Sequence, residues 1–293
     1  MEASNKPKRF LTRRRFLAAA ATGVGGTLLY TWRVEPHWLE VVHRPLPIRN
    51  LPAHLDGTTL AQLSDLHIGP KVDDAYVTHV FDLIRGFSPE IVVYTGDWIS
   101  HHPQFREQTS RVLARLVRGT MGTVGILGNH DYGPGWQDFE CARHVASIAE
   151  EAGCRILRNE LIDIQGLNIV GLDDLWARRF DPDNVLSQLN EATPALALVH
   201  NPDAVDRKGW EGYSGWILAG HTHGGQCKPP FLPPPLLPVQ NRRYTCGEFE
   251  LSGGRQLYIS RGVGHLLRVR FNVRPEVTLF RLVSTKAALD TRE

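Results

Sequence analysis

The sequence predicts an α/β fold in which two mixed β-sheets pack face to face, with helices outside. Strand-like and helix-like runs alternate from about residue 58 to 152, and short apolar runs predominate after that. No linker divides residues 50–285. The chain has 293 residues, of which 42% are hydrophobic, so it can bury one sizeable core. We therefore expect one main domain over residues 50–285.

The first half of this domain shows strands followed by helices. Short apolar runs at 58–63, 91–94 and 123–127 are typical of strands. Helical spacing follows at 73–87 and 105–118, and again at 136–152, where Gly153 is a helix terminator. A strand end followed by a loop is where an α/β protein gathers functional side chains.

The second half is richer in strands. Runs at 161–164 and 168–172 predict a hairpin through Gln165-Gly166-Leu167, and a helix is expected at 183–190. Further strands are expected at 195–199, 216–219, 257–260 and 276–282. Residues 34–49 are expected to connect the N-terminal segment to the domain, and residues 286–293 to form a C-terminal tail.

The N-terminal segment has the features of a targeting sequence. Thr12-Arg13-Arg14-Arg15-Phe16-Leu17 precedes a weakly apolar stretch and resembles the leader of the twin-arginine (Tat) export route. No convincing cleavage motif follows, so residues 1–33 are expected to be a leader or a signal anchor. We expect export by the Tat translocase and membrane anchoring that faces the periplasm or cell exterior. Association with the cytoplasmic side of the membrane is the alternative.

Charge argues against a nucleic-acid partner. Residues 1–15 hold six of the 33 basic residues and one of the 31 acidic ones, so the rest of the chain is slightly acidic. One region, 241–280, is locally rich in arginine. It could serve an anionic substrate or lipid surface, or be a solvated face with scattered ion pairs.

Four cysteines show neither CxxC nor CxxH spacing, which argues against a zinc knuckle or redox motif. Cys141 and Cys154 are expected to be buried free thiols. Cys227 and Cys246 flank a proline-rich segment, 229–238, and could pair if the protein is exported. That segment cannot be a helix or a central strand. It is either a rigid surface loop or an apolar lip that contacts acyl chains or the bilayer.

Five short motifs, each at the end of an apolar run, supply the strong metal ligands of the chain. Their candidate ligands are two aspartates, one asparagine and four histidines: Asp65, His67, Asp97, Asn129, His200, His221 and His223. Within Asp65-Leu66-His67 and His221-Thr222-His223, an extended backbone would point both ligands the same way. Seven such donors are enough for two divalent cations, and their chemistry suits Mn²⁺, Fe²⁺ or Zn²⁺.

The order DxH…GD…GNHD…H…GHTH resembles the calcineurin-like metallophosphoesterase superfamily over residues 58–282. The longer forms around His67 and His221 resemble a branch of exported or membrane-associated bacterial phosphoesterases, including UDP-2,3-diacylglucosamine hydrolases. The resemblance implies that Asp65, His67, Asp97 and His223 hold one metal, and that Asp97, Asn129, His200 and His221 hold the second. It also implies that His130 is catalytic at the leaving oxygen and that Asp131 orients His130.

The expected function is therefore hydrolysis of P–O bonds by attack of a metal-bridging hydroxide. We expect a phosphodiesterase acting on an envelope substrate, lipid-linked or a nucleotide sugar. A general phosphomonoesterase is the alternative, and a non-catalytic scaffold is a second one. His101 and His102 follow Asp97 and could touch substrate. For Asp173 and Asp174, a turn is favoured over a place near the site.

Overall fold

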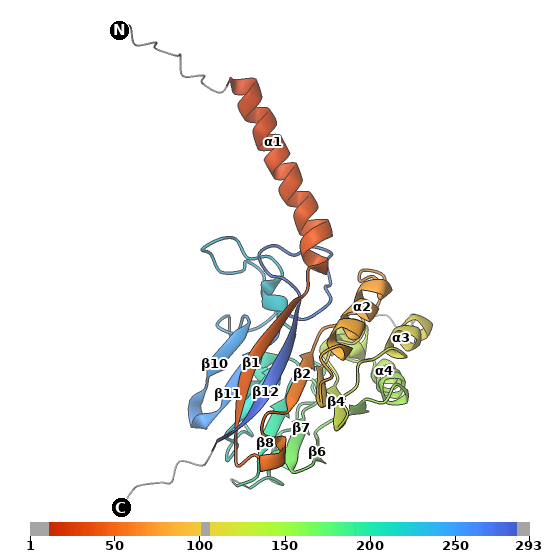
Figure 1. Cartoon of the computed structure of the whole chain (residues 1–293), viewed down its shortest axis with the longest axis vertical. Helices are drawn as coiled ribbons and strands as arrows, with labels where there is room; N and C mark the ends of the chain where they lie inside the picture. Colours follow the sequence, from red (N-terminus) through yellow and green to blue (C-terminus); the bar gives the residue numbers. More distant parts are fainter. Residues whose placement is uncertain (1–11, 101–105, 191, 286–293) are drawn as a thin grey trace, which may run out of the picture.

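Two six-stranded sheets lie face to face in the computed structural model, which describes residues 12–100, 106–190 and 192–285 (Figure 1). The sheets enclose one apolar layer, formed by side chains such as Leu60, Val93, Leu196 and Leu218. The predicted fold class is confirmed.

The first sheet is built around four parallel strands: β2 (Thr59–Leu63), β3 (Ile91–Thr95), β4 (Gly122–Ile126) and β5 (Arg155–Ile156). Strand β12 (Glu276–Thr285) runs antiparallel beside β2, and β1 (Glu40–Arg49) completes the edge. Every residue of β3 is buried. This burial explains why its sequence, IVVYT, is almost continuously apolar, because a parallel strand is covered on both faces.

The second sheet has the order β10 (Gly247–Glu250), β11 (Gln256–Ile259), β9 (Trp216–Ala219), β8 (Ala195–Leu198), β7 (Leu167–Gly171) and β6 (Glu160–Ile164). The four strands β11, β9, β8 and β7 are parallel. The predicted hairpin is formed by β6 and β7, which pair antiparallel.

Helices cover the outer face of the first sheet (Figure 1). These are α2 (Asp74–Arg85), α3 (Arg106–Leu113) and α4 (Phe139–Glu151), and their buried faces join one core with Ala61 and Val92. A short helix, α5 (Asp183–Leu186), lies beside the second sheet, where Val185 packs with Val170 and Ala197. Both α3 and α5 end earlier than predicted.

Strand β1 lies within the segment 34–49, which was expected only to connect. It pairs with β12 along ten residues. Pro45 and Pro47 argue against a strand, but β1 is an edge strand. The amide of Glu40 donates to Pro275 O (2.9 Å), on the side of β12. Because successive backbone nitrogens of a strand point to opposite sides, the nitrogens of the odd-numbered Pro45 and Pro47 point away from β12. The sheet therefore begins before residue 50.

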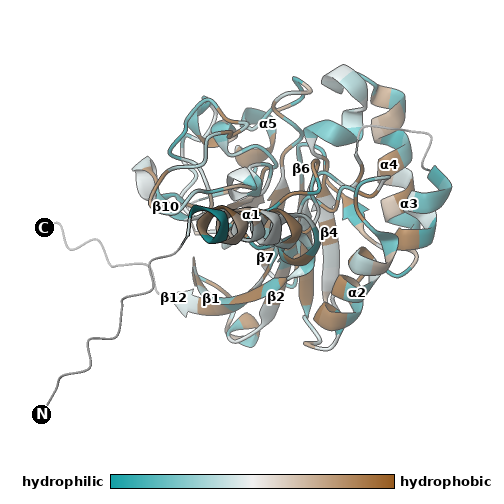
Figure 2. Ribbon diagram, turned by 90° about the horizontal axis from the view of Figure 1, so that it is seen from above, coloured by the Kyte–Doolittle hydropathy of each residue, from teal (hydrophilic) through white to brown (hydrophobic). Residues whose placement is uncertain are grey.

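Helix α1 (Arg13–Leu29) stands away from the sheets and has no buried residue. Figure 2 looks down on this helix and shows its hydrophilic first turn, which holds the arginines. After α1 the chain turns into the domain, where Thr31, Glu35 and Pro36 are buried. Among the described residues, no helix combines the length and apolarity needed to cross a membrane.

Candidate metal centre

Parallel strands bring the five sequence motifs to one edge of the two sheets. Asp65, Asp97 and Asn129 follow the carboxyl ends of β2, β3 and β4 within three residues. His200 and His221 follow β8 and β9 in the same way. Backbone hydrogen bonds join the loops, as from Asp65 N to Gly96 O (3.0 Å). The carboxyl edge of an α/β sheet is where ligands are expected to bind.

One set of donors consists of Asp65, His67 and His223, all buried. The Nε2 atoms of His67 and His223 are 3.0 Å apart, and His223 Nε2 lies 3.2 Å from Asp65 Oδ1. The three ligand atoms lie within 4.8 Å of one another. They can therefore hold one cation.

The second set consists of Asp97, His200 and His221. His200 Nε2 lies 3.1 Å from Asp97 Oδ2 and 3.2 Å from His221 Nδ1. The same Asp97 oxygen is 3.6 Å from His67 Nε2, in the first set. Asp97 thus stands between the two sets, where one carboxylate can serve two cations.

Unsatisfied polar atoms test whether metals fit here. Asn129 is fully buried, yet neither its amide oxygen nor its amide nitrogen has a hydrogen-bond partner among the described residues. A buried amide without a partner costs about 1–3 kcal/mol, so such a group calls for a ligand. Carboxylate, amide and imidazole donors with no thiolate suit borderline divalent cations. The residues present fit two such ions.

Hydrogen bonds to backbone carbonyls fix the ring orientation of two candidate histidine ligands. The Nδ1 of His200 is 2.8 Å from Thr95 O, and the Nε2 of His221 is 2.8 Å from Pro238 O. Because a carbonyl only accepts, each of these nitrogens carries the proton. The other nitrogen of each ring is then free to bind a cation, as is usual for histidine ligands.

The two carboxylates of the site are ionised. Burial alone would raise the pKa of Asp97, but His200, His130 and His67 together hold it well below its usual range. Burial likewise acts to raise the pKa of Asp65, and His223 outweighs it. Burial disfavours charge on His200 too, yet Asp97 raises the pKa of His200 to about 10. In the metal-free chain, a proton on His200 supplies part of the positive charge that the carboxylates require.

The backbone at the ligands is strained, not extended. Asp65, His67, Asp97, His221 and His223 have positive φ angles, between 49° and 72°. The expectation of extended ligand pairs was therefore wrong, although the paired side chains do converge. A non-glycine residue in this region costs of order 1–3 kcal/mol and persists only where the surroundings enforce it. Such strain is common at functional sites.

Two motif glycines are required by close approach. A Cβ on Gly220 would lie 2.0 Å from Ser64 Oγ and 2.5 Å from Asp65 Oδ2. A Cβ on Gly128 would lie 2.2 Å from Asp97 Oδ1. Any side chain at these positions would displace a carboxylate ligand.

His130 lies beside the donors without belonging to either set. Its Nε2 is 3.9 Å from Asp97 Oδ2, and its backbone N–H donates to Asp97 Oδ1 (2.9 Å). Asp131 was expected to orient His130. Its carboxylate accepts from the backbone amides of Trp98 (2.9 Å), Ile99 (3.1 Å) and Gly128 (2.8 Å). Asp131 therefore joins the loops after β3 and β4.

Asp173 and Asp174 both make turn or ion-pair contacts, and Asp174 also lies close enough to His200 and Asp97 to interact with them electrostatically. Asp174 Oδ1 accepts from the amide of Ala177 (2.7 Å), which forms the expected turn. Asp173 accepts from Tyr132 and from Arg158 Nε (3.0 Å). His101 and His102 lie outside the described residues. All four cysteines are free, so Cys227 and Cys246 are not bonded to one another.

The arginines of 241–280 are engaged mainly in holding the fold. Arg261 pairs with Glu276 and Glu40, and Arg255 donates to Val205 O (2.9 Å). Arg270 is fully buried, and its guanidinium donates to the carbonyls of Arg261, Gly262, Gly264 and Val273. Its Nη2 is also 3.3 Å from Nδ1 of His223. Sequence reasoning missed this role, because nothing local distinguishes Arg270 from its exposed neighbours.

We expect Arg270→Met to lower the free energy of unfolding by at least about 3 kcal/mol, because it orphans several buried carbonyls at once. Denaturant unfolding of the metal-free chain measures this. The control is Arg44→Met, which removes an exposed pair with Glu248 and should change stability by less than about 1 kcal/mol. Equal stability of Arg270→Met and wild type would contradict the structural role.

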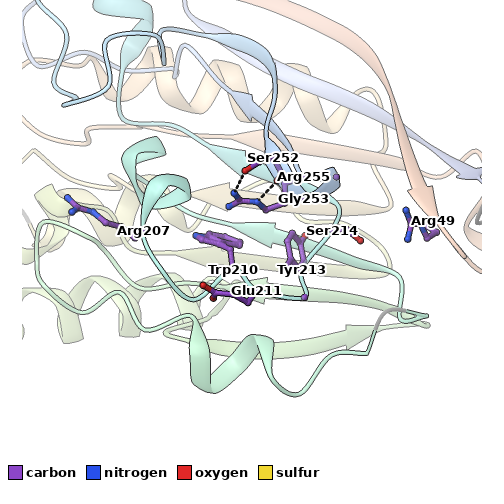
Figure 3. A pocket seen from close by; sticks show the side chains of 11 residues that line it. Arg49, Arg207, Trp210, Glu211, Tyr213, Ser214, Ser252, Gly253 and Arg255 are labelled. Atoms are coloured by element: carbon purple, nitrogen blue, oxygen red, sulfur yellow. Dashed lines mark hydrogen bonds between the residues drawn. The ribbon is translucent and has the colours of Figure 1, made fainter.

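Figure 3 shows the side chains that line a hollow of about 560 Å³, none of which is a metal donor. It is lined by residues next to the amino ends of β9 and β11, such as Ser214 and Gly254, together with Arg49, Arg207 and Arg255. The metal donors follow the carboxyl ends of strands. This hollow is therefore on the opposite edge of the sheet from the candidate site.

Two packed sheets that hold adjacent sets of buried carboxylate and imidazole donors at their carboxyl edge have the arrangement of a two-cation hydrolase such as a phosphatase. The comparison with protein families agrees, since the calcineurin-like phosphoesterase family matches residues 58–225. The chain belongs to this family.

Several curated relatives are similar over nearly their full length. The metallophosphoesterase YkuE of Bacillus subtilis is 32% identical over 289 residues, which cover 94% of this chain and 99% of YkuE. The phosphodiesterase YaeI of Escherichia coli is also 32% identical, over 93% of this chain and all of YaeI. The UDP-2,3-diacylglucosamine pyrophosphatase LpxG of Chlamydia trachomatis is 27% identical, over 90% and 97% respectively.

Proposed function

We propose that this protein is a dinuclear metal phosphodiesterase that hydrolyses P–O bonds of an envelope or lipid-linked substrate. The observation that carries the proposal is Asp97, whose one carboxylate oxygen is within 3.6 Å of a histidine donor from each set. The seven proposed ligands are Asp65, His67, Asp97, Asn129, His200, His221 and His223. When bound, two divalent cations polarise a phosphoryl group and lower the pKa of an attacking water.

The chain's own residues bind and orient the reacting groups. Asp97 holds the two donor sets together, and its contact with the His130 amide fixes the backbone that presents the His130 ring. The ring is nearly buried but reaches the surface, with 7% of the residue exposed. We propose that His130 delivers a proton to the leaving oxygen.

The choice of a diester or anhydride substrate is supported by the relatives. YaeI is named a phosphodiesterase, and LpxG a pyrophosphatase of UDP-2,3-diacylglucosamine, which carries acyl chains.

The proposed location is the outer side of the membrane after Tat export, with α1 retained as an anchor. Its support is the twin arginine in the first turn of α1. Cell fractionation tests this location.

A comparison of bis-p-nitrophenyl phosphate with p-nitrophenyl phosphate, in the presence of Mn²⁺, tests the reaction class. We expect the diester to be hydrolysed with the higher kcat/KM, as the similarity to the phosphodiesterase YaeI suggests. The control is Asp97→Ala on both substrates. Preferential hydrolysis of the monoester would favour a general phosphomonoesterase instead.

A further inference from the structure

Three segments far apart in the sequence meet around the metal centre. They are residues 30–38 after α1, residues 226–238 with the proline-rich segment, and residues 264–272. Gln226 Nε2 donates to the carbonyls of Leu267 and Val269, both at 3.1 Å. The amide of Arg270 donates to Thr31 O (3.0 Å). The segments therefore form one surface and not three separate loops.

This surface carries large apolar side chains that contact solvent. We call six of its exposed members the apolar rim: Trp32, Trp38, Phe231, Leu232, Leu236 and Leu267. Phe231 is fully exposed, Leu236 is 77% exposed and Leu267 is 65% exposed. Single exposed apolar residues are ordinary, but a connected group of this kind marks an interaction site.

The backbone presents part of this rim rigidly. Phe231 has a positive φ of 66°, an uncommon conformation for a bulky residue, and lies between Pro230 and a run of prolines. Proline fixes its own φ angle, so little conformational entropy is lost when such a loop docks. An exposed phenylalanine held in this way is placed for contact with an apolar partner.

The segments that carry the rim contact the metal donors and their motifs. Pro238, which ends the proline-rich segment, accepts from Nε2 of the donor His221 (2.8 Å). A Cβ on Gly225, just after the last metal motif, would lie 2.3 Å from Pro234. At the third segment, Arg270 lies 3.3 Å from the donor His223. A partner that covers the rim therefore lies next to the candidate active site.

The charge of the surface favours an anionic partner. The three segments contain one acidic residue, Glu35, which is buried and accepts from the amide of Val273 (2.6 Å). Arg33 and Lys228 are exposed. Aromatic and aliphatic side chains beside basic ones are the pattern of a protein that binds at the surface of an anionic membrane.

Helix α1 points to a lipid partner in particular. It continues without a break into the first segment and has exposed apolar residues at Leu28 and Leu29 next to the rim. None of its side chains is buried against the domain. A partner that takes both α1 and the rim must be extended and apolar, as a bilayer surface is.

We propose that the apolar rim docks on a bilayer of anionic phospholipids and so places the metal centre at the lipid headgroups. The binding itself does not require catalysis. The inference that the substrate lies at the membrane surface rests on the proposed function, because only a phosphodiesterase docked there would hydrolyse phosphodiester bonds of the headgroups.

Vesicle flotation of the full-length chain tests the proposal, with vesicles of phosphatidylcholine alone or mixed with phosphatidylglycerol. We expect the wild type to bind the anionic vesicles more tightly. The triple variant Phe231→Ser, Leu236→Ser, Leu267→Ser should bind them at least about tenfold more weakly. The matched control is Leu83→Ser, Phe87→Ser, which removes exposed apolar side chains on and just after α2 and should bind as the wild type does.

Equal binding of wild type and triple variant would overturn the proposal, as would equal wild-type binding to both kinds of vesicle. Analytical ultracentrifugation tests whether a second copy of the chain binds the rim instead. A wild type that is dimeric and a triple variant that is monomeric would show that a second copy takes the rim, and would also overturn it. Hydrolysis of a soluble diester separates the two proposals, since its absence in the wild type refutes the proposed function and leaves vesicle binding unaffected.

Discussion

Asp97→Ala is expected to lower diesterase activity by at least about 10³-fold and to leave the protein with almost no bound metal. Several kcal/mol of transition-state stabilisation depend on the cations, and each factor of ten in rate corresponds to about 1.36 kcal/mol. Asp97 is the residue whose loss affects both donor sets, because its Oδ2 lies 3.1 Å from His200 Nε2 and 3.6 Å from His67 Nε2.

Mass spectrometry measures the loss of bound metal, and circular dichroism shows whether the variant is still folded. Removal of the carboxylate also orphans the backbone amide of His130, so a modest loss of stability is expected as well. Asp181→Ala is the control, since Asp181 is exposed. A folded Asp97→Ala protein with the full complement of metal would refute the shared-ligand assignment.

The sequence was sufficient to predict that the carboxylate and imidazole donors come together, because their motifs follow the ends of neighbouring strands. A run such as 91–94 followed by Gly96-Asp97 indicates both a buried strand and a turn at its carboxyl edge. Since neighbouring parallel strands share that edge, as β2, β3 and β4 do, the ligands in their loops must approach one another.

Features set by tertiary contact could not be predicted in this way. The positive φ angles at Asp65 and His67 are imposed by neighbouring loops, as through the bond from His67 N to Asp97 O (3.1 Å). β1 was missed because Pro45 and Pro47 lower the strand propensity of the segment wherever it lies. In the folded protein they cost no ladder hydrogen bond, because no strand pairs with β1 on the side that their nitrogens face. The burial of Arg270 depends on carbonyls that surround it only in the folded chain.

His130→Ala is expected to retain its metals and to lose about 10²–10⁴ in rate on a diester with an alkoxide leaving group. The ring lies at the edge of the donors, 3.9 Å from Asp97 Oδ2, and belongs to neither set. If His130 supplies a proton to the leaving oxygen, the loss of rate must increase with the basicity of that oxygen. With p-nitrophenolate, a good leaving group, we therefore expect a much smaller loss.

The comparison of the two leaving groups separates proton donation from positioning. A histidine that only oriented the phosphate would affect both esters alike, so equal losses on the two substrates would exclude proton donation to the leaving oxygen. Loss of metal from a folded His130→Ala protein would instead make His130 a ligand. His79→Ala, an exposed position on α2, is the control and should match the wild type on both esters. A loss confined to the alkoxide ester, with the metals retained, would show that His130 acts on the leaving oxygen from its position 3.9 Å from Asp97 Oδ2.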